Sequence, residues 1–301
     1  MDLNFFKQTR VLDGGMGQEL LARGMKPNGT LWSANAILNE NYHQLLLDTH
    51  RDFIKAGAEV IVTTTFTTRR KRLKENNIED KFEYLNTKAG EIANQLKKEF
   101  PNVLVAGGLP PQDLTYEADQ RDEDEIFRDF NEQARLLNPY IDFFYFDVWS
   151  SIKEFQCGIK AIKEFKKPYL IGIHISEGTR LPSGEKISDI KKILDNQLLG
   201  VMLSCVSPEN YEKNLKEIKN LNVPFGFKLN GFMTTKPKEG YTSSFFKNFG
   251  GNPNEFLGHR SDLTPDKIGE IAKKFKENGA TILGGCCETR PSHIEAMAKI
   301  K

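Results

Sequence analysis

Four cysteines, at positions 157, 205, 286 and 287, are the residues of this 301-residue chain best suited to metal binding. Cys286 and Cys287 are adjacent and follow two glycines, and Cys205 lies about 80 residues upstream. Three thiolates with an open fourth position are typical of a catalytic zinc site, because zinc is tetrahedral and binds sulfur well. A substrate thiol could fill that position and would be deprotonated there at neutral pH. A reduced structural cluster or a redox pair is the alternative.

Eight short runs of β-branched and aromatic residues are predicted as the strands that must position these cysteines. They cover residues 10–13, 60–64, 103–107, 143–147, 169–173, 200–204, 225–229 and 281–284. Apolar residues recur three and four apart between the runs, which is the period of one-sided helices. This alternation predicts an α/β fold, a single (β/α)8 TIM barrel domain over residues 1–301, although residues 232–253 form a long polar stretch. A doubly wound open sheet is the competing fold, but Asp13-Gly-Gly-Met-Gly17 lacks the third glycine of a nucleotide-binding turn.

The unusual residues fall at the predicted carboxyl ends of the strands, where barrels carry their chemistry. These residues are Asp13, Gly14, Gly15, Thr64, Asp147, Cys205, Cys286 and Cys287. Neighbouring side chains of a strand point to opposite faces. Cys286 and Cys287 can therefore serve one site only if the chain turns at Gly284-Gly285, whose glycines supply that freedom. Cys157, on a predicted helix, is interpreted as a small buried hydrophobe.

Several motifs occur in order between Leu12 and about Ala298. They are Leu12-Asp-Gly-Gly-Met-Gly17, Leu31-Trp-Ser-Ala34, Ala56-Gly-Ala58, Cys205 before Ser207-Pro208-Glu209, and Gly284-Gly-Cys-Cys287 with Thr289, Pro291, His293 and Ile294. Together they resemble the homocysteine S-methyltransferase family, which includes betaine-using and S-methylmethionine-using enzymes. The resemblance implies a zinc-dependent barrel enzyme that moves a methyl group from a small onium donor to the thiol of homocysteine, forming methionine.

The resemblance also implies roles for individual residues. Cys205, Cys286 and Cys287 would bind Zn²⁺. Asp13, with the backbone of Gly14 and Gly15, would hold the amino acid part of homocysteine, and Asp147 would bind its ammonium. Thr64 and Ser204 would also contact substrate. The family commonly has glutamate in place of Asp147 and asparagine in place of Thr64 and Ser204, so we expect a re-tuned geometry.

The donor side of the site needs an aromatic face, because an onium cation without hydrogen-bond donors is best held by cation–π contact. Trp32, Phe66 and Trp149 are the candidates, and Arg69 and Arg70 could bind a donor carboxylate. S-methylmethionine is the first expectation for the donor, followed by S-adenosylmethionine and then betaine or a related carboxylated sulfonium.

His174 ends the fifth predicted strand and could be a fourth metal ligand or a base. A structural role is favoured, because the reaction needs no base once the metal has ionised the thiol.

The composition indicates small-molecule substrates rather than nucleic acid or membrane partners. Lysine and arginine number 42 against 41 acidic residues, a formal net charge of +1. No membrane-spanning run or signal peptide is evident, which predicts a cytoplasmic protein, either a monomer or a small homo-oligomer. A non-catalytic zinc or thiol amino acid binding protein and a zinc-free barrel lyase are the alternative functions.

Overall fold

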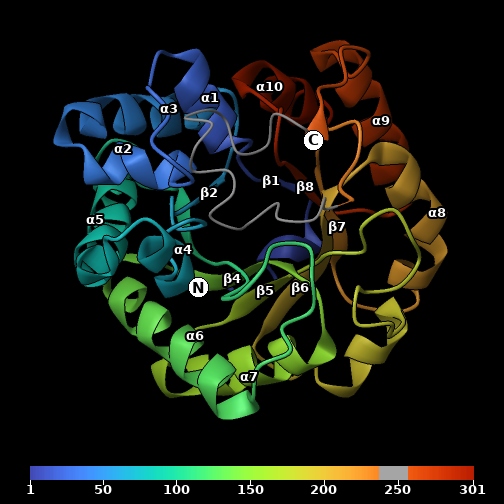
Figure 1. Ribbon diagram of the computed structural model, residues 1–301. Coiled ribbons are helices and arrows are strands. Elements are labelled where there is room, and N and C mark those ends of the chain that lie inside the picture. Colours follow the sequence, from blue (N-terminus) through green and yellow to red (C-terminus); the bar gives the residue numbers. More distant parts are fainter. Residues whose placement is uncertain (237–256) are drawn as a thin grey trace.

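The computed structural model describes residues 1–236 and 257–301, and its centre is one sheet of eight parallel strands. The strands are β1 (Arg10–Val11), β2 (Val60–Val62), β3 (Leu104–Leu109), β4 (Phe143–Trp149), β5 (Tyr169–Ile173), β6 (Leu198–Val206), β7 (Phe225–Leu229) and β8 (Ile282–Gly285). β1 pairs with β8, and a parallel bridge from Leu12 to Val60 nearly closes the sheet into a barrel. Figure 1 looks along this barrel, with the helices outside it. The predicted TIM barrel is confirmed, while most of the polar stretch 232–253 lies outside the described residues.

The helices follow the strands in the order that the apolar periodicity predicts. They are α1 (Met16–Ala22), α2 (Asn35–Leu38), α3 (His43–Lys55), α4 (Arg70–Glu75), α5 (Phe82–Gln95), α6 (Glu123–Leu137), α7 (Ile152–Ile162), α8 (Pro208–Lys219), α9 (Pro265–Glu277) and α10 (Pro291–Ala298). Ser207 and Thr264 cap α8 and α9, each accepting a hydrogen bond from the backbone N–H three residues later. Between β5 and β6 the described chain has a 3-10 helix, Ile187–Lys192, in place of an α-helix. No helix in the described part of the chain is long and apolar enough to cross a bilayer.

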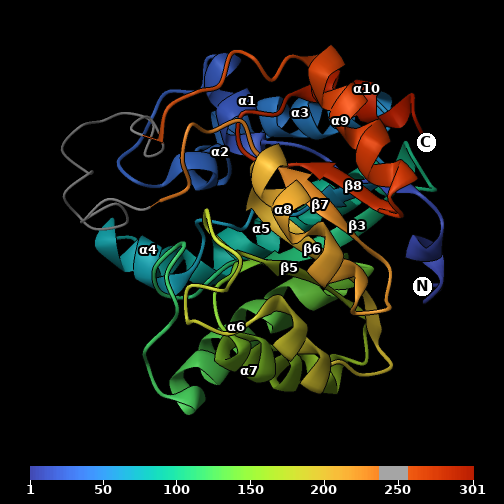
Figure 2. The same cartoon turned by 90° about the vertical axis from the view of Figure 1, so that its right-hand side faces the viewer.

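The interior of the barrel is filled at the end where the strands begin. A 3-10 turn over Phe5–Lys7 inserts Phe6 beneath the barrel, where its ring lies edge-on 6.0 Å from that of Phe143. Leu170, Met202 and other apolar side chains complete this inner core. Both chain ends lie on the same side of the molecule, on the right in Figure 2. Because this apolar core fills the end where the strands begin, the opposite end, where the strands finish, is left for polar residues.

Glu154, in the first turn of α7, has a buried carboxyl group whose effect on stability depends on pH. Its carboxylate is buried and accepts a 2.7 Å hydrogen bond from Ser151 Oγ, and burial raises its pKa from 4.5 to about 7. Because the carboxyl pKa is raised, folding favours the protonated form of Glu154. The contribution of the protonated group to folding stability is therefore fully present below pH 4.5 and is lost as the pH rises through 7. Glu154→Gln is therefore expected to raise the free energy of unfolding at pH 8 by about 1–3 kcal/mol. Urea unfolding at pH 5 and pH 8 checks this, and an equal effect at both values would contradict it.

Candidate active site

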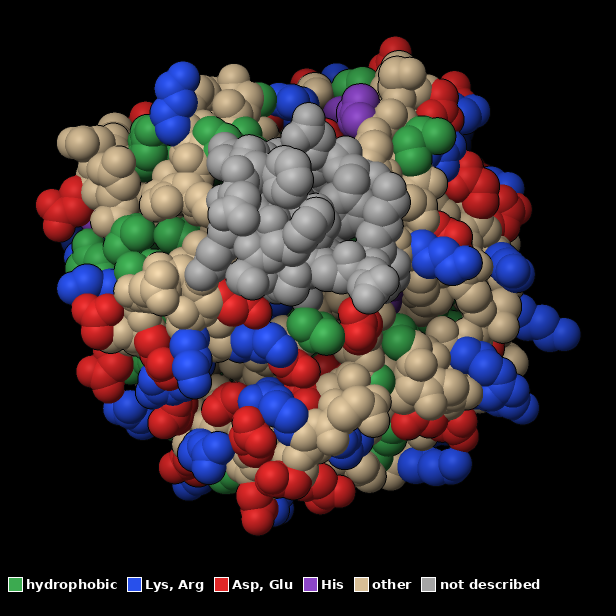
Figure 3. Space-filling model, viewed as in Figure 1, with side chains coloured by type: hydrophobic (Ala, Val, Ile, Leu, Met, Phe, Trp, Pro, Cys, Tyr) green, Lys and Arg blue, Asp and Glu red, His purple; other side chains and the backbone are tan. Residues whose placement is uncertain are grey.

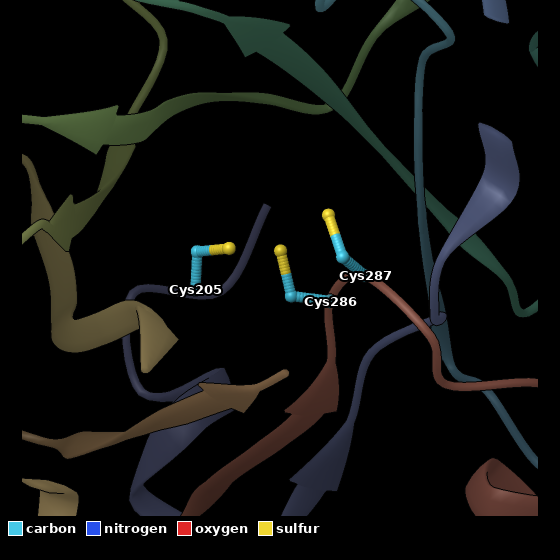
Figure 4. Close-up of side chains that lie close together, drawn as sticks. All are labelled: Cys205, Cys286 and Cys287. Carbon is cyan, nitrogen blue, oxygen red and sulfur yellow. The ribbon is translucent and has the colours of Figure 1, made fainter. Parts of the chain in front are cut away.

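Three of the four cysteines meet at the carboxyl ends of the strands. The sulfur atoms of Cys205, Cys286 and Cys287 all lie within 4.8 Å of one another, and they point into one shared space (Figure 4). Cys205 comes from β6, whereas the other two directly follow β8. All three line one pocket. A cluster of three sulfurs is a donor set that suits a thiophilic metal ion, so the site could bind one.

A β-bulge in β6 turns Cys205 into this pocket. Ser204 pairs with Lys228 and Val206 with the next residue of β7, so Cys205 is an extra residue with a left-handed φ of 52°. In a regular strand Ser204 and Cys205 would face opposite sides of the sheet. With the bulge, Ser204 bonds Tyr145 inside the barrel while Cys205 lines the pocket.

The two glycines before the cysteine pair supply space, and the prediction that they supply the turn is wrong. Neither Gly284 nor Gly285 has a positive φ, whereas Glu288, after the pair, has a φ of 60°. A Cβ on Gly285 would lie 2.1 Å from Thr289 Oγ1. The backbone of β8 therefore passes too close to the following loop for any side chain at this position.

The pKa values of the three thiols are shifted in different directions. Hydrogen bonds from Cys205 and Cys287 hold the pKa of Cys286 well below its usual range. Burial, and then the Cys286 thiolate, raise the pKa of Cys205, and hydrogen bonds to its two neighbours raise that of Cys287. A metal ion that binds all three as thiolates must therefore displace protons, which makes its affinity depend on pH.

Two side chains from elsewhere in the chain form hydrogen bonds with the Cys205 sulfur. Tyr116 Oη lies 2.9 Å from Cys205 Sγ, and Asn230 Nδ2 lies 3.7 Å from it. The Tyr116 ring stacks on His174, with centroids 4.4 Å apart. His174 does not belong to the candidate metal group, and burial lowers its pKa to about 3.

The two predicted carboxylates line the same pocket, together with a lysine that the sequence analysis missed. Asp13 Oδ2 accepts a 2.7 Å hydrogen bond from the Val62 backbone, and Lys228 Nζ donates to Asp13 Oδ1 at 3.4 Å. Burial raises the pKa of Asp147 to about 7. Among the described residues, nothing donates a hydrogen bond to the buried Asp147 Oδ1. Lys228 could have been noticed, because it is a cation inside the apolar strand Phe-Gly-Phe-Lys-Leu.

The remaining predicted substrate residues divide between the pocket and the layer beneath it. Gly14, Gly15 and Thr64 line the pocket, and the hydroxyl of Thr64 lies 3.2 Å from His50 Nε2. Ser204 is fully buried, bonds Tyr145 at 2.6 Å and does not line the pocket. Ser204 lies beneath the pocket because the bulge directs Cys205, the next residue, into it.

Trp32 and Phe66 form an aromatic wall of the pocket, with ring centroids 6.2 Å apart and perpendicular planes. The prediction for Trp149 is wrong. Its ring stacks 4.2 Å from Phe146 and 4.1 Å from Phe130 in the outer core, and it does not line the pocket.

Some of the basic residues after β2 line the pocket and others lie outside it. Arg69 lines the pocket, but Arg70 does not, because its guanidinium bonds Glu132 on the outside at 2.6 Å. Arg72 lines the pocket instead, one helical turn after Arg69. Figure 3 views the face at which the strands end, and its described rim mixes basic and acidic side chains.

A family model and several known proteins are similar to this chain. A family model described as homocysteine S-methyltransferase matches residues 10–300. Homocysteine S-methyltransferase 1 of Zea mays is 26% identical and covers 96% of this chain and 93% of its own. Homocysteine S-methyltransferase YbgG of Bacillus subtilis is 24% identical with the same coverage. The crystal structure of the metallated homocysteine methyltransferase MmuM from Escherichia coli superposes with a TM-score of 0.80, at 18% identity and over 100% of both chains.

Proposed function

Because this chain belongs to the homocysteine S-methyltransferase family and is an enzyme that transfers a methyl group to homocysteine, we propose that Cys205, Cys286 and Cys287 hold a zinc ion for the acceptor thiol. The observation that carries the proposal is the convergence of three sulfur atoms within 4.8 Å in one pocket. A zinc ion held there would lower the pKa of a bound substrate thiol and so keep it as a nucleophilic thiolate. The residues around it then bind and orient the two substrates.

The carboxylates would hold the amino acid part of homocysteine. Asp147 has a buried oxygen without a donor among the described residues, which suits the ammonium of the substrate. Asp13 is fixed by the Val62 backbone and, with Gly14 and Gly15, borders the same space. We take residues 1–301 as one homocysteine-binding domain, because these residues and the cysteines all belong to one barrel.

We propose a small onium donor that carries a carboxylate, with S-methylmethionine as the first choice. Trp32 and Phe66 supply aromatic faces for the onium centre. The guanidinium of Arg69 lies 5.7 Å from the centroid of the Phe66 ring, and Arg72 lines the same pocket. A donor with a cationic methyl-bearing end and an anionic end matches this arrangement of rings and guanidinium groups.

A donor screen on zinc-loaded protein tests this function. Homocysteine is mixed with S-methylmethionine, S-adenosylmethionine, betaine or a carboxylated sulfonium, and methionine is measured. We expect methionine from at least one donor and the fastest turnover from S-methylmethionine. No methionine from any donor would contradict the catalytic proposal and favour a binding protein, and protein that never retains stoichiometric zinc would contradict the metal proposal.

Trp32→Leu is expected to raise the KM for the donor about 5- to 30-fold, because a desolvated cation–π contact contributes about 1–2 kcal/mol. The dissociation constant of homocysteine, measured without donor, should change little. Trp32→Phe keeps an aromatic face and should recover most of the lost donor affinity. Equal effects of Trp32→Leu on donor and acceptor would show that the side chain supports the pocket as a whole.

A further inference from the structure

Lys228 is a buried cation in the floor of the pocket. It lies in the middle of β7, is 5% exposed, and pairs in register with Ser204 of β6 and Gly284 of β8. Its Nζ lies 5.5 Å from the centroid of the Tyr145 ring. A lysine is rarely buried to this extent unless it is paired or has a function.

The hydrogen bonds of Lys228 are incomplete within the described structure. A protonated lysine has three N–H donors. Among residues 1–236 and 257–301, Asp13 Oδ1 is its one hydrogen-bond acceptor, at a long 3.4 Å. Burial opposes the charge of Lys228, but attraction to Asp13, Asp147 and Cys286, together with the hydrogen bond to Asp13, raises its pKa overall, so the ammonium remains charged. A buried, charged donor that lines a pocket needs a further acceptor from whatever fills that pocket.

The register places the backbone of Lys228 just below the cysteine sulfurs. Lys228 pairs with Ser204, one residue before Cys205, and with Gly284, two residues before Cys286. One residue along a strand spans about 3.3 Å, so the Lys228 backbone lies about one to two residue steps below the sulfurs. In homocysteine two methylene groups separate the sulfur from the carbon that carries the ammonium and the carboxylate. That separation is of the same order as the one to two residue steps between the sulfurs and the backbone of Lys228.

We propose that Lys228 Nζ binds the carboxylate of homocysteine and thereby selects thiols that are amino acids. The inference rests on the proposed function, in which the cysteines hold the metal that receives the thiol. Asp147 then receives the ammonium of the substrate, and Asp13 holds Lys228 in place. Lys228 is a binding and specificity residue in this arrangement, because its ammonium contacts the end of the substrate that does not react.

A purely structural role for Lys228 predicts a different outcome. If its ammonium only offset the charges of Asp13 and Asp147, its loss would weaken binding of every thiol acceptor by a similar factor. If it binds the carboxylate, its loss weakens only acceptors that have one. A pair of acceptors that differ only in that group distinguishes these roles.

The experiment measures binding by calorimetry, without donor, to zinc-loaded wild type, Lys228→Gln and Lys228→Met. The two ligands are homocysteine and 3-aminopropanethiol, which is homocysteine without its carboxylate. Both variants are expected to raise the dissociation constant of homocysteine at least 10-fold and that of 3-aminopropanethiol less than 3-fold. Lys228→Arg, which keeps a cation, should lie between wild type and Lys228→Gln for homocysteine.

The test compares the dissociation constants of the two ligands for the same variant, so it stays valid even if that variant is less stable than wild type. Equal factors for both ligands, or no effect on homocysteine, would overturn the proposal for Lys228 while leaving the zinc proposal intact. No homocysteine binding by zinc-loaded wild type would overturn both. Lys167→Gln is the matched control, because Lys167 is also partly buried but bonds the backbone of Ile141 away from the pocket.

Discussion

Replacement of Cys286 with serine is expected to abolish stoichiometric metal binding and to lower kcat/KM for methionine formation at least about 1000-fold, which is about 4 kcal/mol of lost transition-state stabilisation. Cys286 is one of the three sulfurs of the cluster, and hydrogen bonds from the other two thiols hold its pKa well below the usual range, which favours its thiolate form. A serine hydroxyl stays protonated at neutral pH and leaves two sulfurs, too few for a closed tetrahedral set with the substrate thiol. Metal content after dialysis and methionine formation are the measurements.

Cys157→Ser is the matched control for that experiment. Cys157 is a buried cysteine that lies on α7 and outside the candidate metal group. It should therefore keep the metal and the turnover of wild type, apart from a modest loss of stability from a hydroxyl placed among apolar side chains. Full turnover and full metal content in reduced Cys286→Ser would refute the role of the cysteine cluster.

The strands and the end of the barrel at which the polar residues gather could be predicted from the sequence. Both depend on local patterns, namely apolar runs, helix caps and the residues that follow each strand. The predicted strand over residues 225–229 agrees with β7, and Cys205, Cys286 and Cys287 meet as the barrel requires. Parallel strands of a closed barrel finish at one end, so fold class alone brings these residues together.

The direction of individual side chains could not be predicted, because two β-bulges alter the alternation. Regular alternation from Asp147 would point Trp149 into the barrel mouth. The register shifts between Phe146 and Trp149, and Val148 has a left-handed φ of 68°. Trp149 therefore joins Phe146 in the outer core, while Val148 lines the pocket beside Asp147. A bulge is a tertiary feature without a clear sequence signal in this strand.

The prediction for Arg70 is wrong for a similar reason, whereas Arg69 lines the pocket. Their run contains no apolar residue before Leu73 to set the phase of a helix, so the sequence does not show which side chains face inward. The structure starts α4 at Arg70 and places Arg69 and Arg72 on the side of the pocket. Residues three apart share a face of a helix, which explains why Arg72 joins Arg69 and Arg70 does not.

Asp147→Asn is expected to lower kcat/KM for homocysteine about 30- to 1000-fold, because loss of one partner of a buried charged pair removes about 2–4 kcal/mol of binding. The carboxylate lines the same pocket as the cysteines, and among the described residues nothing donates a hydrogen bond to its buried Oδ1, so this oxygen can accept one from the ammonium of homocysteine. An asparagine of the same size keeps the shape but not the charge. Steady-state methionine formation with varied homocysteine measures the change, and the metal content should stay that of wild type.

The acceptor 4-sulfanylbutanoate, which is homocysteine without its ammonium, separates the charge of Asp147 from a general disturbance of the pocket. Asp147→Asn should bind it at least as tightly as wild type does, because the variant removes a carboxylate with no ammonium to face. Asp147→Glu keeps the charge on a chain one methylene longer and should recover most of the affinity for homocysteine. If Asp147→Asn instead weakens both acceptors alike, Asp147 shapes the pocket and does not bind the ammonium.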